Sequence, residues 1–449
     1  MKGRYWLSVV LLLGLALLPF RLHPQQDWFR TGTGLGVEKV RLGVPAFAAG
    51  SGEVRRVARV FHTVLRNDLA TSGIVELVSP SFEPLAVPSL PAELRPEEWV
   101  ESPTRAHMVA YGNLQFSGNQ LFINAWLSDV RNPQVAPVLT RRYRADLTEE
   151  QARRLAHQFA DEIVARLSGG VPGIARTKIA FVSDRTGSKE IWVMDYDGHN
   201  PQRVTRCRFL CLTPRWSPDN SRLAYTAYEQ AAASPQVPRT SIQLYSLLMN
   251  RRLAFPYLGG TTTTPAWSPE GTQLALSSSR TGDHEIYVVA SDGGRMRRLT
   301  FSAGVDISPA WNPRTGRQIA FVSDRGGSPQ IYLMDSEGAS VERLTNGEGY
   351  AVSPAWSPNG QMIAFAWQRE QESFNIYAMD IATRQTIQLT RDSGRNEQPS
   401  WAPDGRHLVF QSTRSGRNQL WLMLADGTGL RQLTFEGRNT APHWSFSVR

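Results

Sequence analysis

The chain has 449 residues, a formal net charge of +9 and a hydrophobic fraction of 41%. This length is too great for a single hydrophobic core, so we expect more than one domain. No run of basic residues and no alternation of basic with aromatic residues accompanies the positive charge, which argues against nucleic-acid binding. Loss of Lys2, Arg4 and Arg21 with a signal peptide would lower the net charge to +6 (9 − 3).

Residues 1–24 are predicted to be a secretory signal peptide. Residues 1–4 include the basic residues Lys2 and Arg4, and residues 5–20 form an apolar run that is too short for a comfortable membrane span. No pair of small residues near residues 19–22 marks a cleavage site, so an uncleaved anchor remains the alternative. Export would also remove the chain from nucleic acid.

Residues 37–170 are predicted to form a small α/β domain. Apolar residues recur at helical spacing in two segments, and Thr148 with Gln151 forms a capping-box pattern before the second. Residues 80–103 hold six prolines and are expected to be mostly loop. In chain order the predicted elements are a strand at 40–44, a helix at 54–69, a strand at 74–78, a hairpin at 108–128 and a helix that follows Thr148 and ends before Gly169.

Cys207 and Cys211 are the only two cysteines of the chain. In an oxidising compartment they can form a disulfide that closes a small loop, and two unpaired thiols are the alternative. Export favours the disulfide. A C-x-x-x-C pair with no second pair of ligands nearby is poor evidence for zinc, so we expect no metal site.

A repeat dominates the chain from residue 177 onward. Each complete repeat begins with a Pro-x-Trp anchor, which a turn and then an apolar run such as Ile319-Ala320-Phe321 follow. A second apolar run comes next, such as Ile331-Tyr332-Leu333, and most units end with a Leu-Thr pair. Four short strands in a unit of this length are typical of a β-propeller blade. The anchor tryptophans are Trp216, Trp267, Trp311, Trp356, Trp401 and Trp444.

The first and last repeats are incomplete in complementary ways. No Pro-x-Trp precedes Ile179-Ala180-Phe181, whereas few residues follow Trp444. A ring in which the C-terminal strand completes the blade begun at residues 177–205 accounts for both and removes exposed sheet edges. The predicted fold is therefore multidomain: a small N-terminal α/β domain, a linker at 171–176, and an all-β six-bladed β-propeller at 177–449 that the C-terminal strand closes.

The domain order and the sequence motifs of the blades resemble those of the TolB family, the periplasmic components of the Tol–Pal system. Pro-x-Trp-Ser-Pro, Ile-Ala-Phe, Ile-Tyr and Leu-Thr recur in the blades, and the junction at 167–181 and Gly43-Val44-Pro45-Ala46-Phe47 are similar as well. The resemblance covers nearly all of the chain after the signal. It implies a non-enzymatic periplasmic monomer with no cofactor, no metal and no small-molecule substrate.

The resemblance also implies the partners. Family members bind the lipoprotein Pal on one propeller face and TolA through the N-terminal segment, and other envelope proteins are further candidates. The system supports outer-membrane integrity and constriction of the membrane during cell division. In this chain residues 25–36 stand in the place of the TolA-binding tail, with Asp27, Trp28, Phe29 and Arg30 as the expected contacts. An ordinary flexible leader is the alternative.

The resemblance places Pal contacts six, four and three residues before particular anchor tryptophans. These positions are Thr261 and Thr264 before Trp267, and Ile307 before Trp311. The family has a histidine where this chain has Thr261. Blade symmetry adds Ser353, Asn396, Glu397, Asn439 and Thr440 to the expected face. Solvated loop tips are the alternative for each of them.

Arginines after the second strands are expected on the same face. Arg185 and Arg325 each follow an aspartate, with which we expect them to pair. Arg280 and Arg414 lack such a neighbour and are expected to be free to bind an acidic or carbonyl-rich partner. Residues 231–238 lengthen the second repeat and predict a protruding loop on this face.

An enzyme is the rival class. No G-x-S-x-G or H-E-x-x-H occurs, the eight histidines are scattered, and Asp195-Tyr196-Asp197-Gly198 is typical of a hairpin turn rather than a calcium loop. A periplasmic propeller hydrolase with a metal site in its channel is the alternative that we retain.

Overall fold

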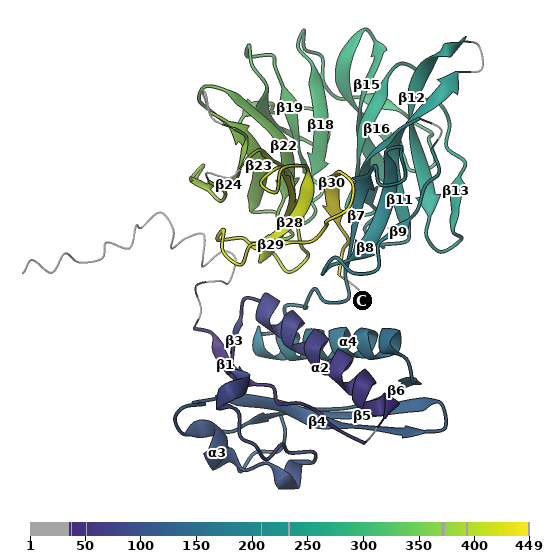
Figure 1. The fold of residues 1–449 in the computed structure, drawn as a ribbon. Helices are drawn as coiled ribbons and strands as arrows, with labels where there is room; N and C mark the ends of the chain where they lie inside the picture. The colour runs from purple at the N-terminus through teal and green to yellow at the C-terminus, as the bar shows by residue number, and fades with distance from the viewer. Residues whose placement is uncertain are drawn as a thin grey trace, which may run out of the picture.

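The computed structural model describes residues 36, 38–50, 52–207, 209–231, 234–369, 373–391 and 394–447. The predicted signal peptide and the tail residues 27–30 lie outside these ranges. An N-terminal α/β part and a six-bladed β-propeller lie one above the other (Figure 1). The predicted fold class is therefore confirmed. Within the described ranges, no helix combines the length and the apolar character that a membrane span needs.

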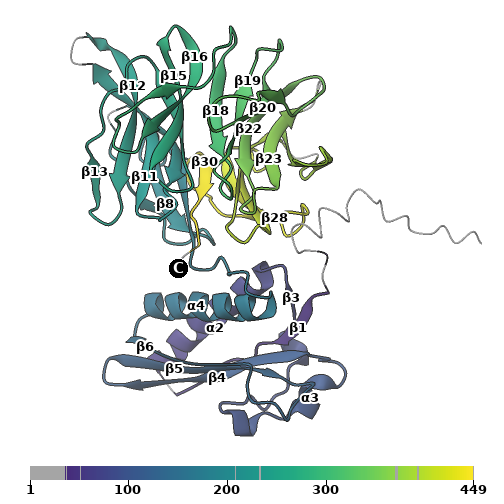
Figure 2. The same cartoon turned by 180° about the vertical axis from the view of Figure 1, so that it is seen from behind.

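The N-terminal part is one sheet that two helices cover. Its strand order is β3-β1-β4-β5-β6, and β2 pairs with β4. Both long helices lie between this sheet and the propeller (Figure 2). The elements are β1 (Val40–Gly43), β2 (Ala48–Ala49), α2 (Glu53–Thr71), β3 (Val75–Leu77), the 3-10 turns Pro80–Phe82 and Pro91–Glu93, α3 (Pro96–Val100), β4 (Met108–Ser117), β5 (Gln120–Asp129), β6 (Leu139–Asp146) and α4 (Glu149–Leu167).

The helices form where the apolar spacing predicts them. In α2, Val57, Phe61 and Leu65 are buried in the core between the two helices and the sheet. The Thr148 hydroxyl accepts a hydrogen bond from the Gln151 amide at 3.2 Å, which caps α4 as the sequence pattern predicts. The sequence did not predict β6, because its run LTRRYRAD alternates poorly between polar and apolar residues.

Each blade of the propeller is a four-stranded antiparallel sheet. Innermost strand first, the sheets are β30 (Asn439–Trp444), β7 (Lys178–Ser183), β8 (Glu190–Asp195) and β9 (Gln202–Arg203); β10 (Cys211–Trp216), β11 (Arg222–Ala231), β12 (Ser234–Ser246) and β13 (Arg251–Leu253); β14 (Thr262–Trp267), β15 (Gln273–Thr281), β16 (Asp283–Ala290) and β17 (Arg297–Arg298); β18 (Asp306–Trp311), β19 (Gln318–Ser323), β20 (Gln330–Asp335) and β21 (Glu342–Arg343); β22 (Tyr350–Trp356), β23 (Met362–Gln368), β24 (Asn375–Asp380) and β25 (Thr386–Gln388); and β26 (Asn396–Trp401), β27 (His407–Ser412), β28 (Gln419–Leu424) and β29 (Arg431–Gln432).

The Pro-x-Trp anchors join neighbouring blades. The Trp267 indole donates its Nε1 hydrogen to the backbone oxygen of Arg215 in the preceding blade at 3.2 Å. Trp356 and Trp401 make the same bond to Ala310 and Ala355. Because the indoles are also buried, each anchor combines a large apolar contact with a satisfied donor.

A threonine closes five of the blades through its hydroxyl, and it follows a leucine in all of these except at Val204-Thr205. Thr345 Oγ1 accepts a hydrogen bond from the Ile331 amide at 3.0 Å and donates one to Gln330 at 2.6 Å. The other members of this arrangement are Thr205 with Glu190, Thr300 with Glu285, Thr390 with Asn375 and Thr434 with Gln419. A threonine at this position therefore satisfies buried polar groups where the outermost strand ends.

The C-terminal strand closes the ring. In the antiparallel pairing of β30 with β7, Trp444 lies opposite Ile179 and Asn439 lies opposite Ser183. Trp444 is 2% exposed and donates its indole hydrogen to Thr177 Oγ1 at 2.7 Å. The first blade therefore consists of the last strand of the chain and three strands from the start of the propeller, as predicted.

Substitutions of Trp444 test this closure. We expect Trp444→Ala to lower the free energy of unfolding by about 3–5 kcal/mol, because it leaves a cavity between the first and last blades. Trp444→Phe keeps most of the packing and removes only the bond to Thr177, at a cost of about 1 kcal/mol. Urea unfolding curves of both variants measure the difference, and equal costs would contradict the packing role.

Candidate partner-binding face

One face of the propeller is built by two kinds of segment, and we call it the rim face. The connectors that precede the innermost strands meet the loops between the second and third strands of the same blade. The Thr261 amide donates to Ser279 Oγ at 3.0 Å, and the Arg395 amide donates to Thr413 Oγ1 at 2.9 Å. The predicted grouping of these segments on one face is confirmed. Their backbone is fixed, which favours recognition by a preformed surface.

Asp184 and Asp324 fix the rim in the same way. The Val305 amide donates to Asp324 Oδ1 at 2.7 Å, and the Arg438 amide donates to Asp184 Oδ1 at 2.7 Å. Each aspartate thus holds the neighbouring connector rather than the arginine that follows it in sequence. The prediction that Arg185 and Arg325 pair with their adjacent aspartates is therefore wrong.

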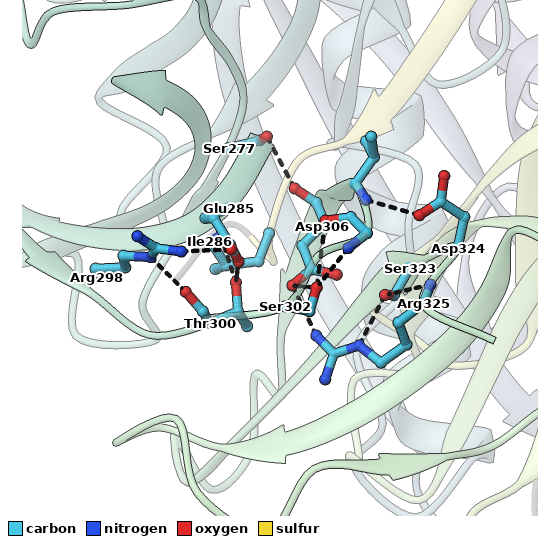
Figure 3. A network of polar contacts seen from close by, with 12 residues as sticks. Ser277, Glu285, Ile286, Arg298, Thr300, Ser302, Asp306, Ser323, Asp324 and Arg325 are labelled. Atoms are coloured by element: carbon cyan, nitrogen blue, oxygen red, sulfur yellow. Dashed lines mark hydrogen bonds and ion pairs between the residues drawn. The ribbon is translucent and has the colours of Figure 1, made fainter. Parts of the chain in front are cut away.

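Arg325 is instead held inside its own blade (Figure 3). Its guanidinium donates to Ser323 Oγ at 2.9 Å and to Asp306 Oδ2 at 2.7 Å, and lies 5.3 Å from the ring centre of Tyr332. Arg185 repeats the arrangement with Ser183, Asn439 and Trp192. The flat guanidinium suits this combination of stacking and directed hydrogen bonds.

Arg414 is held in the same manner. It donates to Ser412 Oγ and to Asn396 Oδ1, both at 3.0 Å, and its guanidinium stacks 5.0 Å from the ring centre of Trp421. The prediction that Arg414 is free is therefore wrong. Sequence analysis missed a signal at the first residue of the innermost strand. In the three blades that hold an arginine in this way, that residue is Asn439, Asp306 or Asn396.

Arg280 differs because the corresponding residue in its blade is Thr262. The Arg280 side chain is exposed and contacts the Met296 sulfur. As predicted, this arginine is not paired with an adjacent aspartate, and its side chain lies at the surface.

A second polar cluster lies beside Asp306 (Figure 3). Glu285 is fully buried and accepts hydrogen bonds from Arg298 and Thr300, both at 2.5 Å. Burial raises the pKa of Glu285, Thr300 and Arg298 oppose this effect, and the neighbouring Asp306 adds to it. Arg298 therefore holds the buried Glu285 in place below the rim, as Arg325 holds the buried Asp306.

The structure separates the residues predicted to contact Pal into three groups. Thr261 is exposed, and Ile307, Glu397 and Thr440 are half-buried, with Glu397 bound to Arg395. Asn396 and Asn439 are fully buried. The prediction that the two asparagines present surface at the rim is wrong, because they act as acceptors for Arg414 and Arg185 beneath it.

Thr264 and Ser353 lie deeper, in the central channel. Both have positive φ angles, 51° and 58°, at a break in the register between the first and second strands of their blades. Such a bulge re-aims the side chains that follow it. These two residues are therefore channel residues rather than rim residues.

Exposed apolar side chains gather on the connectors of the rim face, and sequence analysis did not single them out. Phe301 is 74% exposed and Phe435 is 68% exposed. Each directly follows a Leu-Thr pair, which is the signal that could have found them. The remaining members of this set are Tyr257, Val305 and Tyr350. Exposed aromatic residues next to arginines are typical of protein interfaces.

The insertion in the second repeat forms strand rather than loop. It extends the hairpin of β11 and β12, whose pairing continues past Gln230 and Pro238 to Ala231 and Ser234 after a register shift. The prediction of a loop at 231–238 is therefore wrong for its described residues, which belong to β11 and β12, although the hairpin does lie on the rim side (Figure 1).

Cys207 and Cys211 form the predicted disulfide. Glu190 lies close to both sulfurs, and its carboxylate accepts hydrogen bonds from the Cys207 amide and from Thr205. Because a metal ligand must be a thiolate, the bonded sulfurs do not offer a metal site here.

A buried polar network joins the α/β part to the propeller on the face opposite the rim. Asp68 of α2 bonds His157 Nδ1 of α4 at 2.7 Å and accepts a hydrogen bond from the Tyr196 hydroxyl of the propeller at 2.5 Å. Arg153 pairs with Asp197 at 2.6 Å. Burial alone would lower the pKa of His157, but the hydrogen bond and charge of Asp68 outweigh it and raise that pKa; Asp197 adds to the increase and Arg153 opposes it.

Comparison with known proteins places this architecture in context. A family profile described as TolB beta propeller domain matches residues 165–368 and 344–448. The Tol-Pal system protein TolB of Desulfosudis oleivorans is 34% identical over 302 residues, which are 66% of this chain and 65% of that protein. The Tol-Pal system protein TolB of Bordetella pertussis is 33% identical over 313 residues, which are 69% of this chain and 66% of that protein.

A Protein TolB homolog of Chlorobium chlorochromatii is 34% identical over 278 residues, 62% of this chain and 60% of that protein. These alignments thus span less than two thirds of the relatives' own length. The crystal structure of TolB from Acinetobacter baumannii superposes with a TM-score of 0.77 at 24% identity, and covers 92% of this chain and 98% of that one. Its likeness extends over both parts of the fold.

Removal of Arg325 tests whether the rim arginines are structural. Arg325→Met leaves the Asp306 carboxylate buried without a cation, so we expect a loss of about 3–5 kcal/mol in the free energy of unfolding. Arg280→Met, the matched exposed control, should change it by less than about 0.5 kcal/mol. Chemical denaturation measures both, and a similar small effect for the two variants would contradict a structural role of Arg325.

The pH dependence of stability tests the network between the two parts. Because the pKa of His157 is raised in the folded protein, its contribution is full below the unfolded-state pKa of about 6.5 and is lost as pH rises through the folded-state pKa. We expect the melting temperature to fall more steeply with rising pH in the wild type than in His157→Gln. The exposed His199 provides the control variant His199→Gln. Parallel pH profiles for wild type and His157→Gln would contradict the account.

Proposed function

Because the chain belongs to the TolB family of β-propeller proteins, we propose that it is a non-enzymatic protein of the Tol–Pal envelope system and binds partner proteins through the rim face. The observation that carries this proposal is the exposed set Phe301, Phe435, Tyr257, Val305 and Tyr350 on that face. Water-exposed aromatic side chains on a fixed backbone lose little conformational entropy when a partner covers them.

The chemistry of the rim indicates what kind of partner fits. Phe301 lies 4.6 Å from the Arg298 guanidinium and Tyr257 lies 4.7 Å from that of Arg239, so each aromatic ring carries a cation beside it. Arg280 adds an exposed positive charge. A partner with an apolar centre and acidic or carbonyl groups around it complements this surface. We propose that this partner is the lipoprotein Pal, with Thr261, Ile307, Glu397 and Thr440 at the edge of the contact.

We further propose that the N-terminal tail, with Asp27, Trp28, Phe29 and Arg30, binds TolA in the periplasm. The proposal rests on the position of this segment before the α/β part, since these four residues lie outside the described ranges. The polar network of Asp68, His157 and Tyr196 provides a physical connection between the α/β part and the propeller. If binding at one part alters binding at the other, the effect must be reciprocal. The cellular role would be support of outer-membrane integrity and of constriction during division.

The alternative, a hydrolase with a metal in the propeller channel, does not fit the donors there. The cavity within the channel is lined by all six innermost strands, and none of its described lining residues is an aspartate or a glutamate. His443 is the one histidine of this lining, and its Nδ1 accepts a hydrogen bond from the Trp216 amide at 3.2 Å. Catalytic zinc sites need about three protein ligands, so this donor set does not support the alternative.

Binding measurements with purified Pal test the proposal. We expect Phe301→Ala and Phe435→Ala each to weaken binding at least about tenfold, because central aromatic residues dominate interface energies. Phe116→Ala is the matched control, since Phe116 is 56% exposed but lies on β4 of the α/β part. Calorimetric titration of the folded variants gives the dissociation constants. Absence of binding to the wild type, or equal effects of all three substitutions, would contradict the proposed interface.

A further inference from the structure

The residue between proline and tryptophan in each anchor faces the central channel. All six middle residues line a cavity of about 600 Å³, to which the largely buried anchor tryptophans also contribute. In ring order the middle residues are Arg215, Ala266, Ala310, Ala355, Ser400 and His443. Three small alanines thus form one side of this ring, and the three polar residues follow one another on the other side.

The cavity opens toward the α/β part, away from the rim face. Its lining includes the prolines of the turns that follow the anchors, such as Pro218 and Pro358, and the C-terminal residues 445–447. The turn that follows another anchor lies against α2, because His407 next to it donates to the Thr71 backbone oxygen at 2.7 Å. The cavity is therefore a separate site from the proposed partner-binding face.

The charged side chains among the described lining residues of this cavity are all positive. Among its described lining residues there are two arginines, Arg215 and Arg314, and one histidine, His443, but no acidic residue. Arg314 is exposed at the turn after β18, whereas Arg215 is the residue between proline and tryptophan in the anchor of β10. A small cavity with low-dielectric walls and charge of one sign concentrates ions of the opposite sign.

Arg215 has no counter-ion among the residues that the structure describes. Within the described part of the chain, its guanidinium makes one hydrogen bond, from Nη1 to the Pro214 backbone oxygen at 2.9 Å. Two other enclosed arginines have acidic partners, Arg325 with Asp306 and Arg406 with Asp404. Burial lowers the pKa of Arg215 to about 10, so the guanidinium is still charged at neutral pH. The Arg215 side chain lines the cavity, and no second hydrogen bond of its guanidinium joins it to the residues that the structure describes.

His443 is next to Arg215 in the ring, and Ser400 is next to His443. The Trp216 amide donates to His443 Nδ1 at 3.2 Å, so the neutral imidazole carries its hydrogen on Nε2. Burial, together with the positive charge of Arg215, keeps the pKa of His443 well below its ordinary value. Ser400 Oγ accepts a hydrogen bond from the Trp444 amide at 3.0 Å, which leaves its own hydrogen free to donate. The three side chains therefore offer donors without an accompanying carboxylate.

We propose that the channel binds a small organic anion whose carboxylate or phosphate group is held by the Arg215 guanidinium, with His443 Nε2 and the Ser400 hydroxyl as further donors. An arginine fork matches two oxygens of either group. The cavity volume lies within the range of small-molecule sites, and the alanine side of the ring leaves space for the body of the ligand. The anion would supply a counter-charge that the described lining residues do not provide.

Calorimetric titration with inorganic phosphate and with citrate, in a buffer of low ionic strength, tests this site. We expect the wild type to bind at least one of the two at one site per chain. Arg215→Ala should weaken that binding at least about tenfold, and Arg215→Lys should have a smaller effect because it keeps the charge but not the fork. Arg280→Ala, at an exposed arginine of the rim face outside this cavity, is the control and should leave the affinity within about threefold.

Thermal unfolding gives a second readout. The ligand that binds should raise the melting temperature of the wild type but not that of Arg215→Ala. Ala310→Leu narrows the cavity from the opposite wall without touching Arg215, and it should weaken binding as well. Preference for phosphate or for citrate identifies which oxyanion group the site prefers. Absence of binding of both probes at about 10 mM, or unchanged affinity in Arg215→Ala, would overturn the proposal.

Discussion

The antiparallel pairing of β30 with β7 is the interaction on which the rest of the propeller depends. Without it the first blade would have an open inner edge, the channel would lack one wall, and the neighbouring blades would lose the buried Trp444. The same strand places Asn439 beneath Arg185 and His443 beside Arg215. Both faces of the ring are thus built partly from the last residues of the chain.

The arginines at the two ends of the ring differ in the partners that they contact. At the rim, arginines are stacked on aromatic rings and bonded to Asp or Asn, so their charges are mostly used within the blades. What the rim offers to a partner is therefore largely apolar and aromatic, with Arg280 as an exposed cation. At the opposite end, the channel keeps Arg215 without an acidic partner among its described lining residues, and the α/β part lies close by. A ring of this kind can present a protein-binding surface and a separate small cavity at the same time.

Much of the fold could be predicted from the sequence because each blade repeats a local pattern. The spacing of Pro-x-Trp, the apolar triplets and the Leu-Thr pairs predicts the strands, and the offset between the first and last repeats predicts the closure. The site could be predicted only in part. Asp324 follows the second strand and precedes Arg325, yet it holds Val305, because the partner of a side chain depends on which loops meet in space. Likewise a register break carries Thr264 and Ser353 into the channel, which spacing from the tryptophan does not reveal.

Hydrogen exchange at residues 439–444 tests the ring closure most directly. If the C-terminal strand is an integral part of the ring, its paired amides should exchange only through global unfolding, with the same protection as the amides of β7. Mass spectrometry of peptides from both strands, compared with urea unfolding of the same protein, measures this. Exchange of β30 at the rate of a frayed terminus, while the other blades remain protected, would contradict the account.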